Sequence, residues 1–143
     1  MEITTGLLCD FAQVREGLLF VLSGGVTRLH RPELPGAMGL CAALVVTLDA
    51  IEMERPHEFR LVVVDQDGNR VAEAQGGFQI TPSDSLHVGE KQQVPIAVDH
   101  RFAEVSTTGA HDVVVYVDGH RMFETTFYVT NQLPGAPGGH APG

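Results

Sequence analysis

The chain has 143 residues, a length typical of one domain, and its composition of 43% hydrophobic and 19% charged residues is that of an ordinary globular protein. Its formal net charge is −9, and its nine Lys and Arg residues are spread along the sequence. Nucleic acids and anionic membranes are bound by clustered basic residues, so we expect neither as a partner.

The N-terminal segment, residues 1–25, lacks the basic region and the uninterrupted apolar stretch of a secretory signal peptide. The longest apolar run, around residues 39–48, is too short to span a bilayer. We therefore expect a cytoplasmic protein, in which cysteines stay reduced. Cys9 and Cys41 are not spaced as metal ligands are, and we interpret them as small buried apolar residues.

Short segments rich in Val and other apolar residues recur between turn signals along the whole chain. This pattern is typical of β-strands, and no segment shows a convincing helical period. Prolines and a glycine in residues 31–37, and the polar residues 81–92, predict two longer connections. We predict about eight strands, over residues 2–12, 17–29, 38–50, 57–64, 70–80, 92–103, 111–117 and 120–130.

The third predicted strand, residues 38–50, is apolar on both faces. A helix is the alternative for such a run, but the β-branched residues Val45, Val46 and Thr47 favour a strand. A strand that is apolar on both faces is typical of the interior of a sheet that is covered on both sides.

The second predicted strand has the same property, because Leu18, Phe20 and Leu22 alternate with Leu19 and Val21. A strand of a two-layer sandwich has one inner face, so its second apolar face must be covered by something else. A partner chain, a swapped segment or the loop that follows could cover it. We therefore expect a homo-oligomer or a protein partner.

The last two predicted strands are joined by Asp118-Gly119, a pair that favours a two-residue hairpin turn. Apolar residues then alternate on both sides of the turn and can share one core face: Val113, Val115, Val117, Phe123, Phe127 and Val129. We predict one all-β domain over residues 1–131, an antiparallel β-sandwich that is immunoglobulin-like or C2-like. The Pro- and Gly-rich tail, residues 132–143, is expected to be disordered.

The opening block, LLCDFAQVREGLLFVLSGG at residues 7–25, resembles the N-terminus of a family of small bacterial proteins of unknown function. The matching residues are Leu8-Cys9-Asp10, Ala12-Gln13-Val14, Gly17-Leu18-Leu19 and Gly24-Gly25, with Leu18 where the family commonly has Lys. The Asp65, Asp67, Gly68 turn and the final Val-Asp-Gly hairpin are also similar. The resemblance covers most of residues 2–130 and implies a compact β-sandwich. It implies no activity, no cofactor and no catalytic residues.

Two histidines fall on apolar strand faces. His100 continues the alternation of Val94, Ile96 and Val98, and His111 begins that of the strand after it. If those two strands pair as a hairpin, the two imidazoles lie opposite each other, with Cβ atoms about 5 Å apart. They could then hold a metal ion, with His30 as a third ligand. The alternative is a pair of partly buried, hydrogen-bonded core histidines.

Three further histidines, His57, His87 and His120, fall in loops or at strand starts at the opposite end of the predicted sandwich. Loops at one end of a sandwich are a common place for binding sites, so these residues predict a small-ligand site. The alternative is that loops collect polar residues whatever their function.

Two other motifs are interpreted as ordinary loops. DQDGN at residues 65–69 lacks the Gly and Glu spacing of an EF-hand and predicts a turn. SDSLH at residues 83–87 has no strand-to-helix setting that would activate its serine, so we assign no catalytic residue.

From these observations we expect a non-enzymatic binding or assembly module that acts through protein–protein contacts and needs no cofactor. The first alternative is a metal-dependent enzyme or metal-binding protein that uses His100 and His111. The second is a small-ligand binder that uses His57, His87 and His120.

Overall fold

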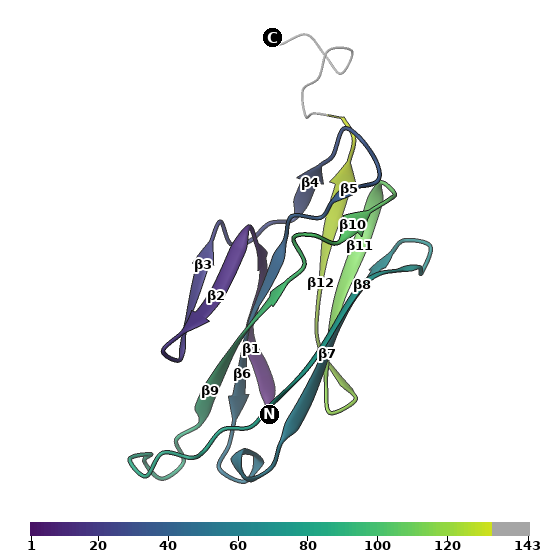
Figure 1. Ribbon diagram of the computed structural model, residues 1–143. Coiled ribbons are helices and arrows are strands. Elements are labelled where there is room, and N and C mark those ends of the chain that lie inside the picture. Colours follow the sequence, from purple (N-terminus) through teal and green to yellow (C-terminus); the bar gives the residue numbers. More distant parts are fainter. Residues whose placement is uncertain (133–143) are drawn as a thin grey trace.

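The computed structural model describes residues 1–132, and these residues form twelve strands and one turn of 3₁₀ helix (Figure 1). The all-β class is therefore confirmed. No helix in this part of the chain is long and apolar enough to cross a membrane. Of the tail at 132–143, all but Gln132 lies outside the described residues. In chain order the elements are β1 (Glu2–Cys9), β2 (Phe11–Arg15), β3 (Leu18–Leu22), β4 (Arg28–His30), β5 (Gly36–Ala37), β6 (Cys41–Leu48), η1 (Glu52–Glu54), β7 (His57–Asp65), β8 (Arg70–Phe78), β9 (Gln92–Asp99), β10 (Glu104–Val105), β11 (Gly109–Val117) and β12 (His120–Thr130).

The described strands outnumber the predicted ones because two predicted strands are interrupted. The chain bends at Asp10, which divides residues 2–12 into β1 and β2. Residues 17–29 are divided into β3 and β4, because Ser23 and Gly25 have φ values of 55° and 91° that an extended strand cannot adopt. The other two additional strands, β5 and β10, pair with each other. Each has only two residues, which is too short to show an alternating pattern in the sequence.

The strands form four sheets. One has the order β1-β6-β9, a second has the order β4-β12-β11-β7-β8, and β2-β3 and β5-β10 are separate pairs. All pairings are antiparallel except β12 with β4, which makes the five-stranded sheet mixed. The prediction of a wholly antiparallel arrangement is therefore corrected at β4. This strand order does not show an immunoglobulin-like or C2-like sandwich.

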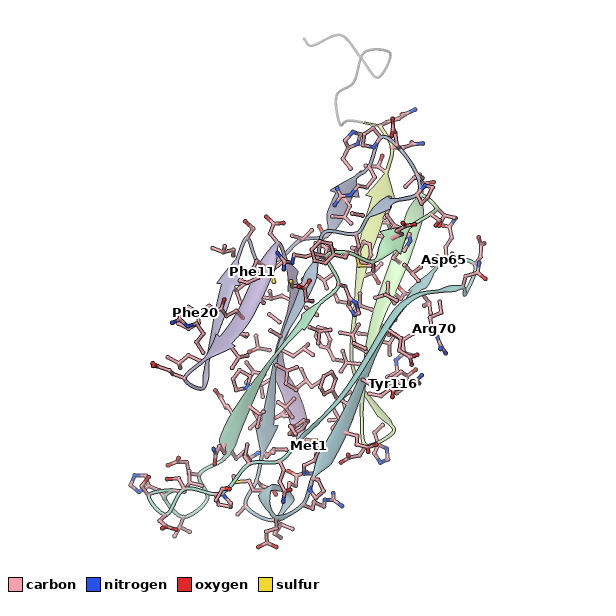
Figure 2. All side chains as sticks on the ribbon, viewed as in Figure 1. Met1, Phe11, Phe20, Asp65, Arg70 and Tyr116 are labelled. Atoms are coloured by element: carbon pink, nitrogen blue, oxygen red, sulfur yellow. The ribbon has the colours of Figure 1, made fainter. Side chains whose placement is uncertain are left out.

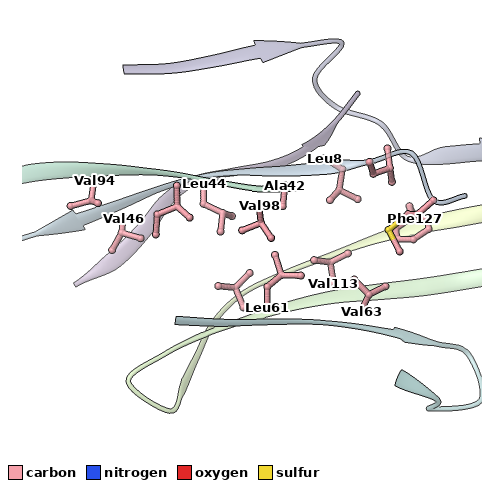
Figure 3. Close-up of a cluster of buried hydrophobic side chains, with 14 of the residues drawn as sticks. Leu8, Ala42, Leu44, Val46, Leu61, Val63, Val94, Val98, Val113 and Phe127 are labelled. Carbon is pink, nitrogen blue, oxygen red and sulfur yellow. The ribbon is translucent and has the colours of Figure 1, made fainter. Parts of the chain in front are cut away.

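The main core lies between the three-stranded and the five-stranded sheets (Figure 3). It is built from alternate residues that each sheet directs toward the other, because side chains on a strand alternate between its two faces. The three-stranded sheet contributes Leu8, Ala42, Leu44, Val46, Val94 and Val98, and the five-stranded sheet contributes Leu61, Val63, Val113, Val115 and Phe127.

The β11–β12 hairpin matches the prediction. Asp118 and Gly119 have φ values of 51° and 81° and lie between the paired residues Val117 and His120, as a type I′ turn requires. Five of the six residues predicted for the shared core face are buried, and the sixth, Phe123, packs against the core while partly buried. The period-two pattern therefore identified the correct face of both strands.

The predicted hairpin between residues 92–103 and 111–117 does not form. β9 pairs with β6, whereas β11 pairs with β7 and β12, so the two strands belong to different sheets. The intervening chain contains β10, which pairs with β5 and carries the chain from one sheet to the other. Consecutive strands can pair or cross between sheets, and the sequence pattern does not distinguish these outcomes.

β6 is buried on both faces, as its sequence indicated. The first part of its second face, at Cys41 and Ala43, is covered by the β2–β3 hairpin, which packs beside β6 and β9 (Figure 1). Cys9, Ala12, Cys41 and Ala43 form a small second core there, and the expected burial of both cysteines is confirmed. The hairpin is thus a third layer supplied by the chain itself.

Replacing Phe127, which is 0% exposed, by Ala is expected to lower the free energy of unfolding by about 3–5 kcal/mol, because it removes buried surface and leaves a cavity. Phe102 is 84% exposed, and Phe102→Ala is the matched control, with an expected change within about 0.5 kcal/mol. Urea denaturation followed by circular dichroism measures both. Equal effects of the two substitutions would contradict this placement of the core.

Candidate functional site

The β2–β3 hairpin is closed by a two-residue turn. Arg15 pairs with Leu18, and the two residues between them, Glu16 and Gly17, have φ values of 52° and 75°. Two successive positive φ values define a type I′ turn, whose twist matches that of two antiparallel strands. Gly17 adopts this conformation without strain. The turn therefore fixes which side chains of β3 face the rest of the protein.

The hairpin has two unlike faces. Ala12 of β2 is buried and Leu19 of β3 is partly buried in the small core that the hairpin covers. The alternate residues of β3 point away from that core and remain in water: Leu18 is 64% exposed, Phe20 52% and Leu22 64%. We call these three residues the outer row. Figure 2 shows Phe20 on the flank of the molecule, on the hairpin.

A cation–π group adjoins the hairpin. The Arg101 guanidinium lies 4.9 Å from the ring centre of Phe11, on β2, and 5.5 Å from that of Phe102. Asp99 fixes this guanidinium through two hydrogen bonds, from Nε at 3.0 Å and from Nη2 at 2.9 Å. These bonds lower the pKa of Asp99 to about 2. The charges of Arg101 and Asp99 are thus paired with each other, and the outer row itself contains no charged residue.

The outward face of the five-stranded sheet is different in character. It carries a hollow of about 480 Å³ lined by residues that include Arg60, Gly76 and Tyr116. Arg60 lies over the Tyr116 ring at 4.8 Å and donates a hydrogen bond to Glu73 at 3.1 Å. Tyr116 and Arg70 mark this face in Figure 2. The one arginine lining the hollow therefore already has an ionic and an aromatic partner.

The three histidines predicted to hold a metal lie on separate elements. His111 is buried on β11, where its ring stacks on Phe127 at 5.1 Å and its Nδ1 lies 3.1 Å from the Gly109 carbonyl oxygen. His100 follows β9, and burial lowers its pKa despite the opposing charge of Asp99. His30 ends β4.

Among residues 1–132, each of these three imidazoles has one buried nitrogen without a hydrogen-bond partner: Nδ1 of His30, and Nε2 of His100 and of His111. The opposed pair that the sequence suggested is absent, because β9 and β11 are in different sheets. No group of three His, Cys, Asp or Glu residues in the described part of the chain could hold a metal ion. Metal binding by His30, His100 and His111 stays a prediction. The burial of His111 and its contact with the Gly109 carbonyl oxygen agree with the alternative, a core histidine.

Both ring nitrogens of His57 have hydrogen-bond partners within the protein. Its ring is buried, with Nδ1 2.6 Å from Asp118 Oδ2 and Nε2 2.6 Å from the Glu52 carbonyl oxygen. An ionised carboxylate and a carbonyl oxygen only accept, so both ring nitrogens must donate and the imidazole is positively charged. Burial opposes this charge, but the hydrogen bond to Asp118 and the one to Glu52 together raise the pKa of His57.

The other two histidines of this group are exposed and are not joined to His57. His87 lies in the segment before β9, where its backbone N–H donates to Glu90. His120 lines a surface hollow of about 480 Å³ with Glu52 and Asp118, both of which already bind His57 or its neighbours. A small-ligand site at these histidines stays a prediction.

Sequence reasoning identified the outer row but missed the residues beside it. Leu18, Phe20 and Leu22 were visible as the second apolar face of a strand. Arg101 and Phe102 were assigned to the end of a strand, and nothing in their spacing showed that they would lie against Phe11, ninety residues earlier in the chain.

Replacing Asp118 by Asn is expected to reveal the charged state of His57. Asn tolerates positive φ and keeps the turn, so the substitution mainly removes the carboxylate charge. The pKa of His57 is raised in the folded protein above its ordinary 6.5, so the stabilisation is complete below that pH and is lost as the pH rises through the folded pKa. Asp118→Asn should therefore cost about 2 kcal/mol near pH 5.5 and less at alkaline pH.

Urea denaturation from about pH 5 to pH 9 measures this difference. Asp67→Asn, at an exposed turn residue, is the matched control and should show no such dependence on pH. A cost that is constant, or that grows with pH, would contradict a charged His57.

The comparisons with known proteins give a family and no activity. A model of a family of unknown function, DUF6941, matches residues 4–130, which is most of the chain. No curated protein and no solved structure matches the chain. The family resemblance noted from the N-terminal block is thus supported in its main point, a family without a known function. By this match over residues 4–130, the chain belongs to the family of unknown function DUF6941.

Proposed function

We propose that this protein is a non-enzymatic binding or assembly module, and that it makes protein–protein contacts through the outer row of the β2–β3 hairpin. The observation that carries the proposal is the exposure of Leu18, Phe20 and Leu22 side by side on one strand. Single exposed apolar residues are ordinary on protein surfaces, but a contiguous group is typical of interaction sites.

The energy of covering this row is large enough to matter. A half-exposed Phe leaves about 100 Å² of ring in water. At about 25 cal/mol per Å², burying Phe20 alone would contribute about 2.5 kcal/mol, and the two leucines, each 64% exposed, add to it. Residues of this kind, in the centre of an interface, supply most of its binding energy.

Charge supports a protein partner for this row. The whole chain has a formal net charge of −9, yet the five residues of β3 include no charged side chain. Uncharged apolar surface beside a paired ion such as Arg101 and Asp99 is the composition of an interface centre with a polar rim.

Phe20→Lys tests the proposal. Immobilised protein of natural sequence is expected to retain at least one protein from an extract of the native cell. The Phe20→Lys variant should retain at least about tenfold less of that protein, which corresponds to about 1.4 kcal/mol of binding free energy. The matched control is Ile51→Lys, since Ile51 is 79% exposed and lies beside η1, away from the hairpin (Figure 1).

Quantitative mass spectrometry of the retained proteins measures the outcome, and circular dichroism confirms that both variants are folded. The proposal fails if Phe20→Lys retains the same proteins in the same amounts, or if the two variants lose them equally.

A further inference from the structure

β3 has a free edge. The hairpin is a two-stranded sheet, so the side of β3 away from β2 has no strand beside it in the described part of the chain, and Figure 1 shows β3 outermost with β2 between it and the other sheets. Natural edge strands are commonly blocked by Lys, by Pro or by a bulge. β3 has none of these: its sequence is LLFVL and its pairing with β2 is regular.

The turn determines which backbone groups this edge offers. In a two-residue hairpin the closing pair, Arg15 and Leu18, is hydrogen-bonded, and such pairs recur at every second position. Phe20 and Leu22 are therefore hydrogen-bonded toward β2, as Leu18 is. The N–H and C=O groups of Leu19 and Val21 point the other way, toward the open edge.

We propose that the open edge of β3 pairs with β3 of a second copy of this chain, antiparallel, with a twofold axis at Phe20. This inference rests on the proposed function and names the partner. In this register the N–H and C=O groups of Leu19 form two hydrogen bonds with those of Val21 in the second copy. Val21 forms two more with Leu19 of the second copy, which gives four backbone hydrogen bonds. The result is a four-stranded sheet of two hairpins.

The same register makes the outer row continuous. Phe20 lies opposite Phe20 of the second copy, and Leu18 lies opposite Leu22. All are non-hydrogen-bonded pairs, in which the Cα atoms are closest, about 4.5 Å apart. Aromatic and apolar pairs across neighbouring strands stabilise a sheet. A register shifted by one residue would place Phe20 at a hydrogen-bonding position of the new strand pair. The N–H and C=O groups of Phe20 already point toward β2, so this shifted register cannot form the same bonds.

Self-complementarity favours a second copy over an unrelated chain. Antiparallel pairing of one strand with itself is the contact that twofold symmetry requires, because each residue meets the same set in the other copy. The edge itself brings no like charges together, because β3 is uncharged and Glu16 at the turn comes opposite Gly24 and not opposite another Glu16.

The side chains of β3 add an apolar contribution to these backbone bonds. The exposed apolar side chains of this strand are Leu18, Phe20, Val21 and Leu22. Edge pairing covers the flank of each side chain that meets the second copy and leaves the outward face of the enlarged sheet open. The contact is therefore at the small end of the range for specific interfaces, and a weak, reversible dimer is expected.

Phe20→Cys tests the register directly. With the twofold axis at residue 20, the two new cysteines have Cα atoms about 4.5 Å apart, within the range for a disulfide. The thiol oxidant diamide should therefore convert most of this variant into a covalent dimer. Cys9 and Cys41 are buried and do not compete.

Leu18→Cys is the matched control, on the same strand and even more exposed, at 64% against 52% for Phe20. Its two cysteines would be four residues out of register, about 13 Å apart, and should not form a disulfide. An equimolar mixture of Leu18→Cys and Leu22→Cys should form mixed disulfide dimers, because these positions are opposite each other.

Sedimentation of the natural sequence, from micromolar to submillimolar concentration, completes the test and should show a reversible dimer that Phe20→Lys abolishes. The inference is overturned if the natural sequence stays a monomer, if Phe20→Cys forms no covalent dimer, or if Leu18→Cys forms one as readily. A monomer whose binding in the cell extract is still lost in Phe20→Lys would reject the second copy and leave the proposed function standing.

Discussion

The structure depends on the burial of β6 on both faces. One face meets the five-stranded sheet in the main core, and the other would lie in water if nothing covered it. The β2–β3 hairpin covers the Cys41–Ala43 part of it with small residues, Ala12 against Cys9, Cys41 and Ala43, which lets the third layer approach closely. The hairpin is narrow, so its own outward face has no cover within the described chain. The exposed outer row is thus a consequence of the same constraint that buries β6.

The ends of the structure are held by polar contacts and not by further apolar packing. His57 joins the start of β7 to η1 and to the β11–β12 turn through its two hydrogen bonds, while the Met1 amino group bonds the Glu52 carboxylate at 2.9 Å. At the other end of β7, Asp65 accepts hydrogen bonds from the backbone N–H groups of Asp67 and Asn69, which lower its pKa. Each of these groups is occupied by a structural partner, which supports placing the binding function elsewhere, on the hairpin.

Outward-facing apolar side chains are shielded from water to different degrees on the β2–β3 hairpin and on the five-stranded sheet. On the five-stranded sheet, outward-facing Val62 and Val114 are buried although no other layer of the described residues covers them. The side chains of Arg60, Tyr116 and Arg121 lie around them. Long side chains can shield apolar surface in this way while their polar ends stay in water. On β3 the neighbours of Leu18 and Phe20 are Arg15 and Gln13, and the apolar side chains stay more than half exposed. A partner can therefore gain far more by covering β3.

Residue alternation and turn residues were enough to predict the all-β class, the β11–β12 turn with the core faces of both its strands, the burial of Cys9 and Cys41, and the two apolar faces of β6 and β3. These features follow from interactions between neighbours in the chain. Packing in three dimensions was needed to place β9 and β11 in different sheets, to run β4 parallel to β12, and to stack Arg101 on Phe11. It also decided which of the two doubly apolar strands is covered within the chain. Such pairings join residues far apart in sequence, and many of them satisfy the same alternation, so only their packing in three dimensions selects among them.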